Sequence, residues 1–253
     1  MNPEQITSPE HKERYGENVE MAVYLVRHAE KQTSKDLSKT TGVDMLLTEK
    51  GIDDAKKFGE ELKVKHPGFK GAKIYHSGID RAKISGDFIA GEEASYIPRE
   101  RDSLVLRGKL TQEAFNKAVE EAKQEGGGEP AMIQKLLDAE DVPIGEKSMT
   151  SKDISRVVAS NIMKMVDMSK KLLSDSKVYV VLVSHAGMIE HFLVDLLKKE
   201  RSGFMKDYLG ELQYLEGPEF MIKRKNKEEI TIEVKFRDES FTISEDQLRA
   251  LAT

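Results

Sequence analysis

The sequence contains no cysteine, which excludes disulfide bonds, thiolate metal sites and a cysteine nucleophile. It also lacks any hydrophobic run close to the ~20 apolar residues of a membrane-spanning helix, and residues 1–20 contain no apolar segment typical of a signal peptide. No basic stripe interleaved with aromatic side chains is present, and the formal net charge is −5. We therefore expect a cytoplasmic protein whose main partner is neither a nucleic acid nor a membrane.

The length and composition indicate a globular protein. The chain has 253 residues, of which 38% are hydrophobic, so it is long enough to bury a sizeable core. Residues 1–20 are polar and charged and offer almost nothing to bury, which predicts a flexible N-terminal leader. We expect the folded part to begin at Met21 and to form a single domain over residues 21–253.

Strand-like and helix-like segments alternate along most of this domain. Apolar, β-branched runs predict strands over residues 21–26, 72–75, 95–97 and 178–183. Apolar residues at helical spacing predict helices over about 48–66, 79–90 and 151–173, and another helix after residue 185. This alternation is typical of a mostly parallel sheet with right-handed crossovers, so the expected fold is an α/β, three-layer α/β/α sandwich.

Two regions depart from the alternation. Residues 104–153 hold a predicted helix over 111–124, a triglycine at 126–128 and a shorter helix over 132–138. Because a triglycine between helices is not a packed element, we interpret this region as a helical cap inserted over the sheet. Short strand-like runs at 220–222, 230–236 and 241–243 are separated by turn residues, which predicts C-terminal β-hairpins at a sheet edge.

Two of the predicted strands end in a histidine. The first runs into Arg27-His28, the strand over 178–183 runs into Ser184-His185, and the strand over 72–75 runs into His76-Ser77. In parallel sheets, ligands bind outside the carboxyl ends of the strands, and Arg81 is close enough along the chain to reach back to the same crevice. Two guanidinium groups and two imidazoles in one small volume are costly without an anion between them. The cluster therefore predicts a phosphate-binding site.

Four short motifs carry a resemblance to a known family. They are Arg27-His28-Ala29-Glu30, Leu47-Thr48-Glu49-Lys50-Gly51 with Ala55, Ser77 followed by Arg81-Ala82, and Ser184-His185-Ala186-Gly187-Met188-Ile189. In these residues, which span 21 to about 190, the chain resembles the histidine phosphatase (phosphoglycerate mutase-like) superfamily. The resemblance implies that His28 attacks phosphorus to form a phosphohistidine, that Arg27, Arg81 and His185 hold the phosphoryl oxygens, and that no metal or other cofactor is needed.

The proton donor for the leaving group is less well defined by the sequence. One branch of the superfamily has an aspartate directly after the second histidine, where this chain has Ala186. The other branch takes a glutamate from the segment after the third strand, which makes Glu100 the candidate and Asp102 the alternative. A phosphatase acting on a phosphoramidate or an aryl phosphate needs no such donor, because those leaving groups depart more easily than an alkoxide.

Further residues are candidates for lining the pocket. They are Glu30, Ser34, His76, Ser77 and Asp102. Relative to family members that act on small phosphosugars, this chain has Ala29, Lys31, Ser34 and Asp54 in place of the usual residues. These differences argue against a phosphoglycerate mutase without affecting the core chemistry.

The predicted function is a metal-independent phosphomonoesterase acting on a phosphorylated small molecule or a phosphoprotein. Two alternatives stay open: a phosphoglycerate mutase-type phosphotransferase, and a catalytically impaired module that binds phosphate as a scaffold. The sequence does not indicate the oligomeric state.

Overall fold

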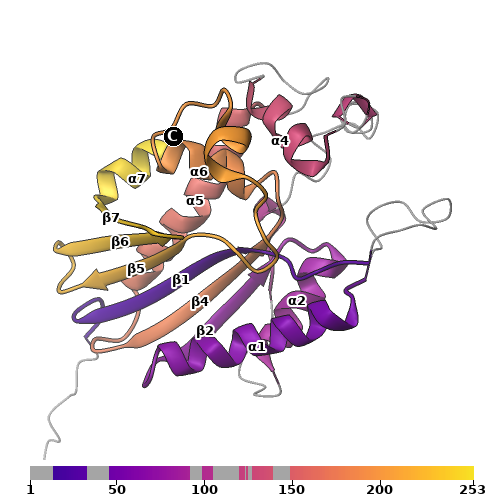
Figure 1. Ribbon diagram of the computed structural model, residues 1–253. Helices are drawn as coiled ribbons and strands as arrows, with labels where there is room; N and C mark the ends of the chain where they lie inside the picture. Colours follow the sequence, from indigo (N-terminus) through magenta and orange to yellow (C-terminus); the bar gives the residue numbers. More distant parts are fainter. Residues whose placement is uncertain are drawn as a thin grey trace, which may run out of the picture.

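The computed structural model describes residues 14–32, 46–91, 99–104, 120–122, 124, 127–138 and 149–253. Seven strands form one sheet, and helices cover both of its faces (Figure 1). The strands are β1 (Val19–Arg27), β2 (Lys70–His76), β3 (Arg99–Glu100), β4 (Lys177–Ser184), β5 (Glu219–Arg224), β6 (Ile230–Phe236) and β7 (Glu239–Ile243). The helices are α1 (Glu49–Lys65), α2 (Asp80–Ala90), α4 (Glu129–Asp138), α5 (Ser151–Ser169), α6 (Ile189–Leu196) and α7 (Glu245–Leu251).

The sheet has the strand order β3-β2-β4-β1-β5-β6-β7. The four strands β1 to β4 are parallel, whereas β5, β6 and β7 follow as antiparallel neighbours. Because β6 reverses the direction of β5, five of the seven strands run the same way. The predicted mostly parallel sheet with hairpins at one edge is therefore confirmed.

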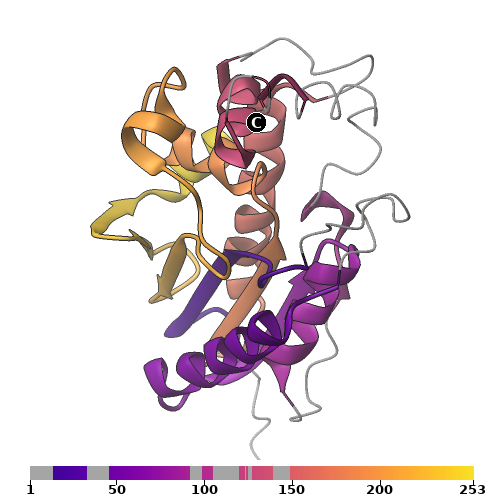
Figure 2. The ribbon, with the colours of Figure 1, turned by 45° about the vertical axis from the view of Figure 1, so that its right-hand side comes forward.

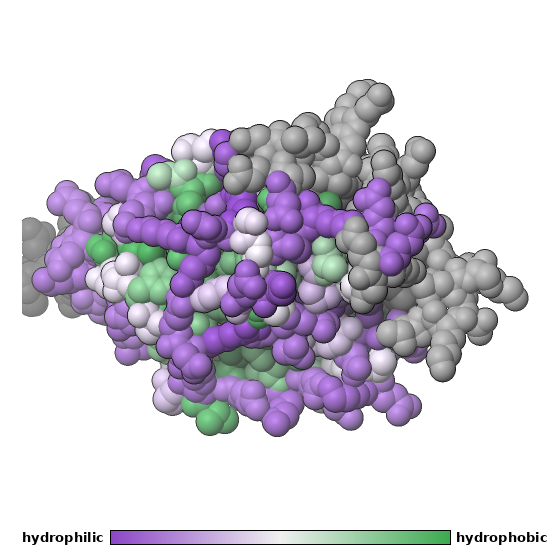
Figure 3. Space-filling model, turned by 45° about the horizontal axis from the view of Figure 1, so that its top comes forward, coloured by the Kyte–Doolittle hydropathy of each residue, from purple (hydrophilic) through white to green (hydrophobic). Residues whose placement is uncertain are grey.

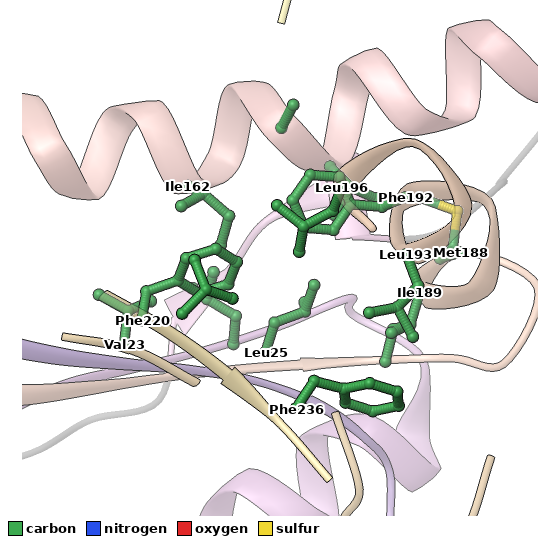
Figure 4. Packing of buried hydrophobic residues seen from close by; sticks show 14 of the residues in the cluster. Val23, Leu25, Ile162, Met188, Ile189, Phe192, Leu193, Leu196, Phe220 and Phe236 are labelled. Carbon is green, nitrogen blue, oxygen red and sulfur yellow. The ribbon is translucent and has the colours of Figure 1, made fainter. Parts of the chain in front are cut away.

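The central strand β1 is buried on both faces, which explains its nearly continuous apolar sequence. Met21, Val23 and Leu25 point into a core shared with α5 and α6. Figure 4 shows this packing, with Val23 and Leu25 of the sheet below Ile162 of α5 and Phe192 of α6. The alternate residues of β1 point into a second core against α1 and α2. The two cores make the three layers that the sequence predicted.

Helix caps fix where the helices begin. The Thr48 side chain accepts a hydrogen bond from the Gly51 backbone N–H at 2.9 Å, so Thr48 is the N-cap of α1. Thr150 and Asp153 form a capping box at the start of α5. In α1, a Cβ at Gly51 would lie 2.3 Å from the Glu30 carbonyl oxygen, so only glycine allows the helix to approach the end of β1 this closely.

The boundary that we predicted at Met21 lies too far along the chain. Residues 1–13 are outside the described residues, but β1 begins at Val19. Before it, Gly16 N–H donates to the Leu172 carbonyl at 2.9 Å, and Ser174 N–H donates to the Arg14 carbonyl at 2.9 Å. The segment from residue 14 is therefore tied to the loop before β4. The sequence did not predict this, because the segment is attached by backbone hydrogen bonds and its polar side chains form no pattern that indicates a strand.

The third strand and the inserted region also differ in detail from the prediction. The expected strand over 95–97 lies outside the described residues, and β3 is found at Arg99–Glu100, paired with Tyr75 and His76 of β2. Within 104–153, residues 120–122 and 124 are helical, and α4 begins at Glu129, three residues before the expected start. Both ribbon views place α4 on the same side of the sheet as α5 and α6 (Figures 1 and 2).

The described surface is dominated by polar side chains. In the view of Figure 3, hydrophilic residues cover most of this surface, with hydrophobic areas between them. The most exposed large hydrophobic residue among those described is Val64, at 81%. No helix in the described ranges combines the length and apolarity that crossing a bilayer requires.

Candidate active site

The register of the sheet brings the two strand-end histidines together. Arg27 at the end of β1 pairs with Ser184 at the end of β4, so His28 and His185 leave the sheet side by side. The His28 backbone N–H donates to the Ser184 carbonyl at 2.9 Å, and the imidazole ring centroids are 5.2 Å apart. Both residues are buried: 3% of the surface of His28 and 6% of the surface of His185 are exposed to solvent. The parallel register thus builds the pair that the sequence predicted.

The hydrogen bonds of His28 fix its tautomer. Its Nδ1 lies 2.7 Å from the Ala29 carbonyl oxygen, and its Nε2 lies 3.1 Å from Nε of Arg81. A carbonyl oxygen can only accept and a guanidinium can only donate, so Nδ1 carries the proton and Nε2 presents a lone pair. The neutral imidazole is therefore held with its Nε2 lone pair directed at Arg81, and a lone pair of this kind can act as a nucleophile once that hydrogen bond is given up.

The surroundings keep this imidazole neutral. Burial lowers the pKa of His28 well below its usual range, and the positive charge of Arg81 lowers it further. Smaller contributions of the same sign come from Arg27 and Lys31. His28 therefore needs no separate base to become nucleophilic at neutral pH.

His185 has different partners. Its Nε2 lies 2.6 Å from the Ser77 hydroxyl oxygen, while its Nδ1 has no hydrogen-bond partner among the described residues. Burial is the main reason that the pKa of His185 lies well below its usual range. A proton on His28 would lower this pKa further, and the positive charge of Arg81 also lowers it. Ser77 follows β2, which pairs with β4, so three neighbouring strands supply this part of the site.

Arg27 is held in place from several directions. Its side chain is buried, and its Nη1 donates to the Leu212 carbonyl at 2.5 Å. The guanidinium carbon lies 4.4 Å from the centre of the Tyr214 ring, which is within range of a cation–π interaction. Nε of Arg27 has no hydrogen-bond partner among the described residues.

Carboxylates that the sequence analysis did not select also reach Arg27. Glu129, the first residue of α4, accepts a hydrogen bond from Nη2 of Arg27 at 2.7 Å. Glu211 lies 3.6 Å from Nη1 of Arg27. Glu129 and Tyr214 belong to segments far from β1 in the sequence, so strand-end spacing could not reveal them. Their positions follow from the packing of α4 and of the segment that precedes β5.

Lys31 adds a further cation to the site. Burial lowers the pKa of Lys31, and so does the charge of Arg81, whereas the carboxylate of Glu129 partly offsets both. Burial likewise lowers the pKa of Arg81, again with Glu129 acting in the opposite direction. Arg81, Lys31 and Glu129 are therefore close enough for each charge to affect the others.

The candidates for lining the pocket fall into separate places. Glu30 accepts a hydrogen bond from the Thr48 hydroxyl at 3.2 Å and lies 3.6 Å from Lys50 Nζ, at the start of α1. His76 is buried, and its Nδ1 accepts a hydrogen bond from the Gly78 backbone N–H at 3.1 Å. Ser34 lies outside the described residues. The contacts of Glu30 and His76 thus support the loops around the site.

The two candidate proton donors lie at and after β3. Glu100 is exposed, and its carboxylate lies next to Gly78, where a Cβ would approach it to 2.0 Å. Gly78 has a φ of +75°, so glycine is required there both for the backbone and for the space. Asp102 starts a short 3₁₀ turn, Asp102–Leu104, and its side chain lies outside what the structure describes.

A buried carboxyl group lies behind the site. Glu190, in the first turn of α6, is fully buried and accepts a hydrogen bond from the Gly187 backbone N–H at 2.6 Å. Burial raises the pKa of Glu190 to about 7. Its position within the apolar run after His185 was a signal that sequence reasoning missed. Among the described residues, no cluster of three or more His, Asp or Glu side chains is arranged to hold a metal ion.

This geometry agrees with the family comparison. The family model described as "Histidine phosphatase superfamily (branch 1)" matches residues 23–211. The chain belongs to the histidine phosphatase superfamily. The match covers all four motifs that carried the resemblance. A search of curated protein sequences gave no significant match.

Solved structures of other proteins share the histidine phosphatase fold. A phosphoserine phosphatase mutant from Entamoeba histolytica, in complex with phosphoserine, is 19% identical, with coverage of 89% of this chain and 95% of that chain and a TM-score of 0.50. A phosphoglycerate mutase from Bacillus anthracis str. Sterne is 16% identical, with coverage of 94% and 99% and a TM-score of 0.53. A mycobacterial glucosyl-3-phosphoglycerate phosphatase is 16% identical, with coverage of 86% and 98% and a TM-score of 0.54. At these identities the likeness concerns the fold alone.

Proposed function

We propose that this protein is a phosphoric monoester hydrolase that works through a phosphohistidine on His28. The observation that carries this proposal is the neutral imidazole of His28. Its Nδ1–H is held by the Ala29 carbonyl, and its Nε2 lone pair faces Arg81. An aligned, neutral nucleophile beside a guanidinium is suited to attack on a phosphoryl group.

The reaction has two steps. Nε2 of His28 attacks phosphorus, the bond between phosphorus and the ester oxygen breaks, and that oxygen takes up a proton from a general acid and leaves as the alcohol. A water molecule then attacks the phosphohistidine, the bond from Nε2 to phosphorus breaks, and inorganic phosphate leaves. The carbonyl of Ala29 stabilises the positive charge that forms on the imidazole in the first step, because it accepts the Nδ1–H hydrogen bond throughout.

Three residues are proposed to hold the phosphoryl oxygens: Arg27, Arg81 and His185. Arg81 already points at Nε2 of His28, the atom to which phosphorus would bind. His185 lies beside His28, and its buried Nδ1 is without a partner among the described residues. Charge stabilisation from such preorganised groups is typically the largest contribution to catalysis of this kind.

The proposed substrate is a phosphorylated small molecule. Solved structures with the same fold include a phosphoserine phosphatase and a glucosyl-3-phosphoglycerate phosphatase, whose names indicate small phosphate monoesters. A phosphoprotein is the alternative substrate.

The test is to trap the covalent intermediate. Protein turning over p-nitrophenyl phosphate is quenched in base, where phosphohistidine survives, and peptides are examined by mass spectrometry. We expect a phosphoryl group on the peptide that contains His28, and its loss in a folded His28→Ala variant. Release of inorganic phosphate identifies a hydrolase, whereas transfer to a second phosphate acceptor without release identifies a mutase-type enzyme. Tight phosphate binding with neither turnover nor a trapped intermediate would overturn the proposal in favour of a scaffold.

A further inference from the structure

The inserted region places a carboxylate inside the proposed phosphoryl site. Glu129 Oε2 is 2.7 Å from Nη2 of Arg27, and the Glu129 side chain is only 36% exposed. Its charge also acts on Arg81 and on Lys31. Glu129 therefore faces the same cations that would receive a phosphoryl group.

The helix that carries Glu129 is firmly packed. Met132, Ile133, Leu136 and Leu137 of α4 are buried in the core. Gln134 donates to the Arg201 carbonyl at 2.8 Å and accepts a hydrogen bond from the Met205 backbone N–H at 2.7 Å. The carboxylate of Glu129 is thus presented by an ordered helix, which is the kind of support that a catalytic group requires.

Binding of a phosphoryl group changes the balance of charge at this carboxylate. Nη1 of Arg27 donates to the Leu212 carbonyl and Nη2 donates to Glu129, so a phosphoryl oxygen that binds Nη2 lies directly beside the Glu129 carboxylate. A dianion that takes Nη2 leaves the carboxyl group beside a second anion. Like charges at short distance favour protonation of one partner.

The other charged and titratable groups around Glu129 come from several elements. Cations are supplied by Arg27, by Lys31 and by Arg81 of α2. Glu211 lies beside the same guanidinium, and Tyr214 and the buried Glu190 are affected by the charge of Glu129. A bound dianion offsets two of the three cations, so the acidic groups then outweigh the remaining positive charge.

We propose that Glu129 is the proton donor of this site. Glu129 gives up its hydrogen bond with Arg27 when the phosphoryl group binds, and it then protonates the leaving oxygen. The proposal rests on the proposed function. As the bond between phosphorus and the ester oxygen breaks, the Glu129 carboxyl proton moves to that oxygen, giving a neutral alcohol and a carboxylate. In the second step this carboxylate takes a proton from the attacking water, so that Glu129 ends protonated beside the phosphate, as it began.

This assignment competes with the donor that the sequence suggested. Glu100 comes from the exposed end of β3, with its carboxylate beside Gly78, whereas Glu129 directly contacts a residue proposed to bind phosphate. Both groups are glutamates, so the same amide substitution tests each. The structure favours Glu129.

The experiment compares two substrates in four forms of the full-length protein: wild type, Glu129→Gln, Glu100→Gln and Glu211→Gln. Glu211 is the matched control, since it is a second glutamate near Arg27, 3.6 Å from Nη1. General acid catalysis is worth ~100-fold to ~10,000-fold for a poor leaving group and little for a good one. We expect Glu129→Gln to lose at least ~100-fold on an alkyl phosphate and less than ~10-fold on p-nitrophenyl phosphate. Glu100→Gln and Glu211→Gln should show no such selectivity, so that any loss of rate is of similar size on the two substrates.

Vanadate binding supplies a second readout. Glu129→Gln removes the carboxylate that competes for Arg27, so it should bind vanadate at least as tightly as wild type, while a damaged α4 would weaken binding. Equal losses on both substrates, or selective loss in Glu100→Gln instead, would overturn the assignment to Glu129 while a trapped phosphohistidine leaves the proposed function intact. If wild-type protein traps no phosphohistidine, the proposed function fails and the donor role fails with it.

Discussion

The carboxyl ends of β1 and β4 look alike in the sequence but differ in their chemistry. Both β1 and β4 are apolar, buried strands that lead directly into a histidine, and the two strands are neighbours in the sheet. Nε2 of His28 accepts a hydrogen bond from Arg81, whereas Nε2 of His185 contacts the Ser77 hydroxyl. One imidazole therefore presents a lone pair beside a fixed cation, and the other lies beside a neutral group.

The difference comes from elements outside the two strands. Arg81 is carried by α2 and Ser77 directly follows β2, and both reach the site because β2 lies beside β4. The strand-end pattern thus determines where the histidines lie, while their neighbours determine what each can do. The following predictions test whether His28 and His185 have different roles.

The largest effect is expected from removing each histidine in turn. His28→Ala should lower turnover of p-nitrophenyl phosphate by at least ~1,000-fold and abolish the trapped intermediate, because the nucleophile is gone. His185→Ala should cost ~100-fold to ~1,000-fold, the usual range for one group that stabilises developing charge, and should still give phosphohistidine on His28. An intermediate trapped on His185 would reverse the two roles.

A smaller effect is expected from Arg81→Gln. Burial is the main reason that the pKa of His28 is lowered, and the Arg81 charge is the second. Without that charge the pKa of His28 rises, so a larger fraction of His28 is protonated at low pH and the acidic limb of kcat/KM moves to higher pH. Phosphate inhibition should weaken ~10-fold to ~100-fold, since hydrogen bonds to charged groups contribute ~1.5 to ~3 kcal/mol.

The control for this prediction is Arg101→Gln, whose guanidinium lies 4.1 Å from the centre of the Tyr75 ring. It should leave both the pH profile and phosphate inhibition nearly unchanged. An unchanged acidic limb in Arg81→Gln would mean that Arg81 does not act on His28 in solution.

The part of the site that sequence reasoning could predict is the part that the sheet builds. His28, His185, Ser77 and Arg81 follow strands or begin a helix, and the parallel register brings them together. Glu129 and Tyr214 could not be predicted in this way. They reach Arg27 only because α4 and the segment before β5 pack where they do, and no periodicity in the sequence encodes that packing.

The fold shows the same division. Strands with continuous apolar sequences were predicted to within a few residues, because burial on both faces leaves a clear pattern. The polar segment from residue 14 and the two-residue strand β3 gave no such pattern, since polar contacts, chiefly backbone hydrogen bonds, join them to their neighbours.

A buried group behind the β4 histidine should affect stability more than turnover. The pKa of Glu190 is raised from 4.5 to about 7, so the folded state favours its neutral form. The neutral Glu190 carboxyl group contributes fully to the stability of the folded state below about pH 4.5. This contribution is lost as the pH rises through about 7, because the buried group then ionises. Glu190→Gln should therefore stabilise the protein at pH 8 by of order 1 to 3 kcal/mol, and much less at pH 5. Chemical denaturation at both pH values checks this, and equal effects at the two values would contradict it.

The smallest effect is expected from Ser77→Ala, which removes the group that distinguishes His185 from His28. The Ser77 hydroxyl lies 2.6 Å from Nε2 of His185, and it also accepts a hydrogen bond from the Ile79 backbone N–H at 3.4 Å. Loss of one buried hydrogen bond costs ~0.5 to ~1.5 kcal/mol, so turnover of p-nitrophenyl phosphate should fall by less than ~10-fold. The phosphohistidine should still form on His28, because none of the hydrogen bonds described for that imidazole involves Ser77. Loss of the trapped intermediate in a folded Ser77→Ala variant would mean that Ser77 acts on the phosphoryl group itself. In that case the difference between the two strand ends would not lie in how each imidazole is held.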